Sequence, residues 1–195
     1  DKGKYKILSL ESSDKYYNNF IKVIDSKTKI EDERNYKTYD SGIFIDIFPM
    51  DFFDDLSLVE KTYKLESFKL LSFSKKENIQ YGDSKLKDFI RLFFWVMLKP
   101  VSPRFFAKKI KKAVESYYKE NGKYLGLVGC SKWKYDDVFD YNPFEELIEL
   151  DFEDCKFFAP KNYDEILRKY YGDYMEFPPV EKRVYPHEIK AYYVD

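Results

Sequence analysis

A short apolar run interrupted by one carboxylate restricts the fold of this chain more than any other feature. Residues 43–48 are Ile and Phe apart from Asp46, and Gly42 and Pro49 lie at the two ends of the run. β-Branched and aromatic residues bounded in this way predict a β-strand. Because the run is apolar on both faces, we expect an inner strand that helices cover on both sides.

Asp46 is the first candidate for chemistry. A lone charge in the middle of a buried strand costs free energy unless it is paired, hydrogen-bonded or bound to a metal ion. One interpretation is therefore a metal ligand or a catalytic base. The other is a structural carboxylate that accepts hydrogen bonds from backbone amides or points into a solvated cleft. The strand by itself favours neither.

The overall composition narrows the class of partner. The 195 residues include 34 Lys or Arg and 35 Asp or Glu, which gives a net charge of −1. Nucleic-acid binding needs a clear basic excess or stripe, so we expect no nucleic-acid partner. The length suits one domain, and we expect a single domain over residues 1–195. Aromatic residues make up 20 % of the chain, so much of the core is expected to be aromatic.

Several kinds of site are excluded by residues that the chain lacks. Its two cysteines, Cys130 and Cys155, and its one histidine, His187, are too few for a disulfide framework or for a zinc site of three or four Cys and His ligands. A single histidine also argues against a hydrolytic triad, and no nucleophile elbow, P-loop or dinucleotide fingerprint occurs. We expect both thiols to be reduced and buried in a cytoplasmic protein.

Strand and helix signals follow one another along the chain and predict an α/β or α+β fold with a small mixed sheet flanked by helices. Residues 29–41 and the Pro-containing tail, 173–195, are expected to be irregular. Besides the strand at 43–48, we expect strands at 5–10 and 21–24 and a hairpin over 148–157. We also expect a short helix from Ser12 or Ser13 toward Phe20. Longer helices are expected over 58–73, over 84–98, after Pro103 and after Asn162.

Two of these helices leave a question open. The second half of the helix at 84–98 is apolar all round, which is typical of a helix buried on several sides and, less often, of one that contacts a membrane. Its longest apolar stretch, 92–98, is far short of the ~20 residues that span a bilayer. The helix after Pro103 carries four lysines mostly on one face, which is either a solvated surface or a face that lies on anionic lipid.

The C-terminal region contains a second group of candidate residues. Tyr171-Gly172-Asp173-Tyr174-Met175 is followed by Pro178-Pro179, Arg183 and His187. Arg183 could pair with an anion and His187 could donate or accept a proton. The alternative is a C-terminal arm that packs its Tyr and Pro residues on the domain.

Taken together, the two motifs resemble the LicD family of phosphotransferases. The family's strand motif, close to Gly-x-x-Ile-Asp-Ile-Phe-Pro-Leu-Asp, is matched by residues 42–51 with Met50 in place of Leu. Its C-terminal pattern is matched in order by Pro160, Tyr163-Asp164, Leu167, Tyr171–Met175, Pro178-Pro179, Arg183 and His187. The middle of the chain, about residues 56–135, is generic.

The resemblance implies a nucleotidyltransferase-like fold, a relationship to fukutin-related proteins, and an enzyme. Such an enzyme moves a phospho-alcohol, most often phosphocholine, from a CDP-linked donor such as CDP-choline to a cell-surface glycan, such as a lipopolysaccharide or teichoic acid. The alternatives are a transferase for another CDP-alcohol such as CDP-ribitol, and a non-catalytic module of the same fold that binds glycans or a membrane surface. The expected location is cytoplasmic, with peripheral contact at the inner face of the membrane.

The resemblance also implies roles for individual residues. Asp46 would be a ligand for Mg²⁺ or Mn²⁺ or the base for the acceptor hydroxyl, and His187 a second catalytic group. Asp51, Tyr171, Gly172, Asp173, Tyr174 and Arg183 would contact the substrate. The family's principal metal ligands come from an Asp-Asp-Asp-x-Asp cluster upstream of the strand, and residues 1–40 do not match it. We therefore expect the C-terminal part of a longer chain, active at full length and inactive as these 195 residues alone.

Overall fold

The computed structural model describes residues 3–32, 39, 41–79, 84–131, 133–183 and 189–194. Helices and strands are mixed, and the strands described form small antiparallel sheets, which confirms the α+β class. The strands are β1 (Tyr5–Leu8), β2 (Ile21–Asp25), β3 (Thr28–Asp32), β4 (Phe44–Ile47), β5 (Asp51–Phe53), β6 (Tyr124–Gly126), β7 (Val138–Phe139), β8 (Leu147–Phe152), β9 (Cys155–Pro160) and β10 (Ile189–Tyr193).

The pairing of these strands is antiparallel throughout the described part of the chain. One sheet has the order β1-β2-β4 and another the order β5-β6-β7, while β3 pairs with β10 and β8 with β9. The predicted hairpin is confirmed, since Phe152 pairs with Cys155 across a two-residue turn. Strands β3 and β10 lie in stretches for which the sequence predicted irregular structure, and they pair with each other although about 160 residues separate them along the chain.

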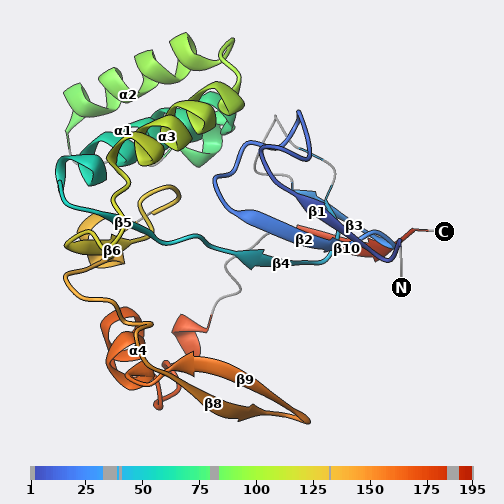
Figure 1. The fold of residues 1–195 in the computed structure, drawn as a ribbon. Coiled ribbons are helices and arrows are strands. Elements are labelled where there is room, and N and C mark those ends of the chain that lie inside the picture. Colours follow the sequence, from blue (N-terminus) through green and yellow to red (C-terminus); the bar gives the residue numbers. More distant parts are fainter. Residues whose placement is uncertain are drawn as a thin grey trace.

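The helices lie where the apolar periodicity predicted them. They are α1 (Ser57–Phe73), α2 (Lys85–Leu98), α3 (Pro103–Tyr117) and α4 (Tyr163–Tyr171), with 3₁₀ turns η1 (Lys76–Asn78), η2 (Lys134–Asp137) and η3 (Val180–Lys182). Ser84 and Ser102 cap α2 and α3 as predicted, and Gly172 ends α4 with a φ of +67°. Helices α1, α2 and α3 gather on one side of the molecule with α2 outermost, whereas α4 and the β8–β9 hairpin form a separate lobe (Figure 1).

The largest buried cluster joins the helical layer to β5. Phe53 and Leu58 are fully buried, and Val59, Ala113 and Val128 pack around them. Helices α1 and α3 meet along this cluster, because their apolar faces can be buried only against another element.

The expected short helix between Ser12 and Phe20 is wrong, and Arg104 explains why. This segment forms turns, and the Arg104 guanidinium donates hydrogen bonds to the carbonyl oxygens of Leu10, Ser13 and Tyr16 at 2.5–2.7 Å. In an α-helix most of these carbonyls would accept bonds from their own backbone. A tertiary contact from α3 therefore decides the local structure.

The prediction of an inner strand with two covered faces is wrong for β4. Among the described residues β4 pairs only with β2 and forms the edge of its sheet. Ile45 and Ile47 are 71 % and 51 % exposed, whereas Phe44 and Asp46 are partly buried on the opposite face. An apolar run does not show whether a second strand or helix covers it, so composition could not separate the two cases. Gly42 is required just before the strand, because a side chain there would collide with the backbone carbonyl of Asp25.

Candidate functional site

A cleft of about 1180 Å³ lies between the β1-β2-β4 sheet, helix α1 and helix α4. Lys22 of β2 and Asp46 of β4 line it from the sheet, Glu66 and Phe73 from α1, and Tyr170 from α4. Pockets that hold small ligands usually have volumes of about 300–1,000 Å³. The cleft is therefore large enough for a nucleotide-linked substrate, and it is the principal candidate site.

Lys22 and Asp46 form an ion pair in the wall of this cleft. They face each other directly in the β2–β4 register, and the Lys22 Nζ lies 2.6 Å from an Asp46 Oδ1. The Lys22 side chain is only 6 % exposed, and burial lowers its pKa although Asp46 opposes that shift. The Asp46 side chain is 22 % exposed and lines the open space. The pair therefore places one cation and one carboxylate together at the edge of a cavity that could hold a substrate.

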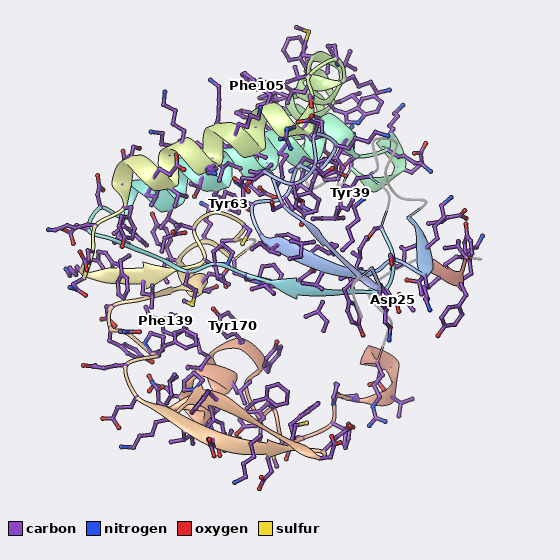
Figure 2. The ribbon with its side chains drawn as sticks, turned by 45° about the vertical axis from the view of Figure 1, so that its right-hand side comes forward. Asp25, Tyr39, Tyr63, Phe105, Phe139 and Tyr170 are labelled. Carbon is purple, nitrogen blue, oxygen red and sulfur yellow. The ribbon has the colours of Figure 1, made fainter. Side chains whose placement is uncertain are left out.

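Aromatic rings surround this pair. The Lys22 Nζ lies 3.0 Å from the ring centroid of Phe44 and 5.6 Å from that of Phe20, and Phe20 packs on Phe48. The aromatic residues that line the cleft are Tyr17, Phe20, Tyr39, Phe44, Phe48, Phe73, Trp133, Phe139, Phe144, Tyr170 and Tyr171. Figure 2 shows Tyr39 beneath the helical layer, and Phe139 and Tyr170 where the α4 lobe meets the rest of the molecule. Ring faces attract cations, so such a cleft suits a ligand that carries an organic cation.

The far wall of the cleft contains polar groups that the sequence did not single out. Asp137 is 2 % exposed and accepts hydrogen bonds from the Ser131 hydroxyl at 2.5 Å and from the Trp133 backbone amide. Burial and the nearby Asp137 carboxylate raise the pKa of Tyr170. The hydrogen bonds to Asp137 fix the loop that forms this wall of the cleft, and they keep Asp137 and Tyr170 in its lining.

Cys130 also lines the cleft, and burial raises the pKa of its thiol to about 12. Both cysteines are free, as expected, but Cys155 is exposed on the β8–β9 hairpin and Cys130 is only partly buried, so the prediction of two buried thiols is wrong. The protonated Cys130 thiol is a poor nucleophile at neutral pH. Covalent catalysis through Cys130 is therefore not supported.

The structure does not bring Asp51 into the cleft with Asp46. Asp51 begins β5 and lines a second, smaller cavity of about 330 Å³ together with Pro49 and Lys111. Burial raises the pKa of the Asp51 carboxyl. Asp46 belongs to the β1-β2-β4 sheet and Asp51 to the β5-β6-β7 sheet, and in an extended segment two residues five positions apart point to opposite faces.

Only some of the predicted C-terminal site residues lie at the cleft. Tyr171 lines the cleft, and Gly172 ends the helix beside it. Asp173 is exposed, and Tyr174 donates a hydrogen bond to Asp164 at 2.8 Å, so neither lines the cleft.

Arg183 is also exposed and lies outside the residues that line the cleft. Its Nε donates to the carbonyl oxygen of Pro178 at 2.7 Å, and its guanidinium lies 5.3 Å from the Phe177 ring centroid. His187 lies outside the described residues. The substrate roles of these residues stay predictions.

Lys22 is the site residue that the sequence analysis missed. The sequence feature that could have identified Lys22 is its place between Ile21 and Val23 in a predicted strand. A charged side chain among apolar strand residues needs a partner, and the same argument applies to Asp46. Two neighbouring strands, each with one charge of opposite sign among apolar residues, predict a cross-strand pair.

The described residues do not form a metal site by themselves. No three Asp, Glu, His or Cys side chains within residues 3–32, 39, 41–79, 84–131, 133–183 and 189–194 are grouped so that they could hold an ion. Mg²⁺ binds through one or two carboxylates together with water and substrate phosphates, and Asp46 is already paired with Lys22. Among the described residues, Asp46 thus stays the predicted ligand in the cleft for the metal ion that the family resemblance implies, and further ligands would have to come from elsewhere.

Comparison with known proteins adds one similarity. The lipopolysaccharide cholinephosphotransferase LicD of Haemophilus influenzae is 29 % identical to this chain over 187 residues. The alignment covers 92 % of the chain and 66 % of the relative, so the chain spans just under two thirds of that protein. No family model and no solved structure matches the chain. The chain is thus similar, over nearly all of its length, to part of a cholinephosphotransferase, which supports the resemblance drawn from its two motifs.

Proposed function

We propose that this protein, at full length, transfers phosphocholine from CDP-choline to a cell-surface glycan, with the aromatic cleft as its substrate site. The observation that carries the proposal is the alignment of 92 % of the chain with a lipopolysaccharide cholinephosphotransferase. The cleft adds physical support, because it combines aromatic rings with a buried cation and a carboxylate.

Phosphocholine ends in a quaternary ammonium group, which has no N–H to donate and is recognised mainly by aromatic faces. The cleft offers such faces on two sides, from Phe20, Phe44 and Phe48 near the sheet and from Tyr170 and Tyr171 on α4. The flat cytosine base of the donor could stack on a ring of the same kind. Both ends of the donor would thus bind through rings, which leaves the charged pair to act on the phosphates.

Lys22 and Asp46 could act on the two groups whose charge changes during transfer, the phosphoryl group and the acceptor hydroxyl. The acceptor hydroxyl oxygen would attack the phosphorus of the phosphocholine group, the bond from that phosphorus to the bridging oxygen would break, and CMP would leave. The Lys22 ammonium would offset negative charge on the transferred phosphoryl group. The Asp46 carboxylate would accept the proton of the acceptor hydroxyl. Lys22 would have to turn from Asp46 toward the phosphate as the donor binds.

Tyr171 would contact the donor directly, since it lines the cleft and is 72 % exposed. Gly172 and His187 keep their predicted substrate and proton-transfer roles. Asp173, Tyr174 and Arg183 lie outside the lining of the cleft and would contact parts of the substrate that extend beyond it. Mg²⁺ or Mn²⁺ would supply charge neutralisation when bound, and its site would need ligands besides Asp46.

A non-catalytic module that binds glycans or a membrane surface is the second candidate. The observation in its favour is that the described residues group no three potential metal ligands, although the related transferases are expected to depend on metal. A transferase specific for CDP-ribitol is a third candidate, and the aromatic cleft argues against it, because ribitol carries no cation.

Donor binding separates these candidates. We expect calorimetry to show that the protein binds CDP-choline more tightly than CDP-ribitol. Tyr171→Ala should weaken CDP-choline binding by a factor between a few-fold and about thirtyfold, which is the range expected for the loss of one cation–π contact. The matched control is Tyr193→Ala on β10, which removes an exposed ring that lies outside the cleft. The affinity of this variant for CDP-choline should equal that of the wild type. Equal binding of both donors, or equal effects of both variants, would contradict the proposal.

A further inference from the structure

The outward face of α2 is apolar. Leu86 and Phe89 are 69 % and 67 % exposed, and Phe93 and Met97 are 54 % and 57 % exposed. Ile90, Phe94 and Val96 add to the same surface. At 3.6 residues per turn, these seven side chains lie within an arc of roughly 160° around the helix. We call this surface the α2 apolar face.

The polar and buried groups of α2 lie on its other side. The buried Trp95 donates a hydrogen bond from its Nε1 to the Ser74 carbonyl oxygen at 3.0 Å, which fixes the helix against the end of α1. Asp88 and Arg91 form an ion pair on that side and are only partly exposed. The orientation of α2 is therefore set by specific contacts, and it leaves the apolar face outward, the reverse of an ordinary surface helix.

Basic side chains flank the α2 apolar face. Residues 84–112 contain nine Lys or Arg and a single acidic residue, Asp88, in a chain whose net charge is −1. On α3, exposed Lys108 and Lys112 lie beside Phe105, which is 49 % exposed, and Figure 2 shows Phe105 near α2. Lys85 and Lys87 are exposed at the start of α2. Three of the nine face other partners, namely Arg91 with Asp88, Arg104 with backbone carbonyls of residues 10–16, and Lys111 with Glu11. The other six are lysines of α2, of its C-terminal end and of α3, so positive charge borders the α2 apolar face.

We propose that the α2 apolar face docks on the surface of an anionic lipid bilayer. A protein partner could cover an apolar face, but the basic rim selects a negatively charged occupant, and a second copy of this chain would bring the same positive charge against it. Lipid supplies both requirements, since aromatic and aliphatic side chains enter the boundary between headgroups and acyl chains while lysines meet the anionic headgroups. Each basic residue near such a surface adds to the attraction, so the concentration of Lys and Arg strengthens binding.

The face would lie on the bilayer rather than cross it. No helix in the described part of the chain has the length and hydrophobicity that a membrane span requires. The proposal stands on α2 and α3 alone and is independent of the transferase function proposed above.

Sedimentation with vesicles tests this proposal. The wild-type protein should bind vesicles of mixed phosphatidylserine and phosphatidylcholine, and bind less in high salt or when phosphatidylcholine is the only lipid. The double variant Phe89→Ser/Met97→Ser should lose at least about tenfold in partitioning, because two large apolar side chains are removed. The matched control is Phe158→Ser/Met175→Ser, which removes the same residue types at positions that are 73 % and 75 % exposed in the α4 lobe, and it should bind like the wild type.

A second pair of variants tests the basic rim. Lys108→Glu/Lys112→Glu should reduce binding to anionic vesicles, whereas Lys6→Glu/Lys27→Glu, with the same change in net charge, should not. Circular dichroism would confirm that each variant is folded. Absence of binding by the wild type, or equal loss in test and control variants, would overturn the proposal. So would a wild-type dimer that Phe89→Ser/Met97→Ser converts to a monomer without any change in vesicle binding, because the face would then join two copies of the chain.

Discussion

The Lys22 ammonium lies 2.6 Å from the Asp46 carboxylate, on residues that face each other across β2 and β4. Neither charge is fully solvated, so each depends on the other. The pair also lines the cleft of about 1180 Å³, where its groups can reach a ligand. Its contribution to folding and its contribution to function can therefore be measured separately.

Replacing Asp46 by Asn should lower activity far more than it disturbs the fold. Loss of a catalytic base typically reduces the rate by ~10²–10⁴-fold. The stability loss should stay below the ~3–5 kcal/mol of a fully buried pair, because Asp46 is partly exposed and Asn can still accept a hydrogen bond from Lys22. Transfer assays and denaturant unfolding measure the two effects. Asp154→Asn, in the β8–β9 turn, is the control and should change neither.

Removing both charges should be less harmful to stability than removing the carboxylate alone. Lys22→Met with Asp46→Asn leaves no unpaired buried ammonium and keeps an apolar chain of similar length. In a double-mutant cycle of unfolding free energies, the pair should show a coupling of about 1 kcal/mol or more. Additive effects of the two substitutions would mean that the ion pair contributes nothing to the fold.

Replacing Asp51 by Asn should not destabilise the protein at neutral pH, whereas replacing Asp46 should. Burial raises the pKa of Asp51, so the folded state favours the neutral carboxyl. The stabilising contribution of the protonated form is complete below the unfolded pKa of 3.8 and is lost as the pH rises through the folded pKa. Asp51→Asn should therefore be at least as stable as the wild type at pH 7, with the difference shrinking toward low pH. Marked destabilisation by Asp51→Asn at pH 7 would show that the ionised carboxylate has a partner in the fold.

The two cysteines should differ in reactivity. Burial raises the pKa of Cys130 from 9.0 to about 12, whereas Cys155 is exposed. Iodoacetamide at pH 8 should label Cys155 quickly and Cys130 only slowly, and peptide mass spectrometry distinguishes the two. Rapid labelling of Cys130 in the folded protein would contradict its raised pKa.

Alkaline unfolding gives a second test of Cys130. A raised folded pKa means that its contribution to stability is present below pH 9 and declines as the pH rises toward 12. Buried Tyr16 and partly buried Tyr170 have raised pKa values and act in the same direction. Cys130→Ala should therefore lose less stability than the wild type between pH 9 and pH 11, with Cys155→Ala as the control.

Mg²⁺ should bind these 195 residues only weakly when substrate is absent. In the described part of the chain no three candidate ligands are grouped, and Asp46 alone cannot complete an octahedral shell. Calorimetry with Mg²⁺ or Mn²⁺ would measure this. Micromolar affinity would show that a set of ligands has been misplaced.

Local patterns predicted the helices well and the sheets poorly. The caps at Ser84 and Ser102 and the apolar spacing on α3 are local signals, and they gave correct boundaries. The pairing of β3 with β10 depends on residues far apart in the sequence, and no local signal reports it. The exposed state of α2 was likewise decided by which neighbours cover it, so its apolar sequence suggested burial while the structure leaves only Trp95 buried.

The candidate site was predicted in part. Asp46 stood out because a charge in an apolar strand needs an explanation, and it does line the cleft. Lys22 was missed because the partner of that charge comes from another strand, and Asp51 was grouped with Asp46 because the two are close in sequence. Spatial partners across a sheet are set by register, which a single sequence specifies only weakly.

Transfer of phosphocholine is the measurement that decides the proposed function. The full-length protein would be incubated with Mg²⁺, lipopolysaccharide and CDP-choline or CDP-ribitol, and the glycan would be analysed by mass spectrometry. We expect phosphocholine on the glycan and free CMP with the wild type and with Asp154→Asn, and at least about a hundredfold less with Asp46→Asn. Transfer at the wild-type rate by Asp46→Asn, or preferential use of CDP-ribitol, would contradict the proposed function and the role of the Lys22–Asp46 pair.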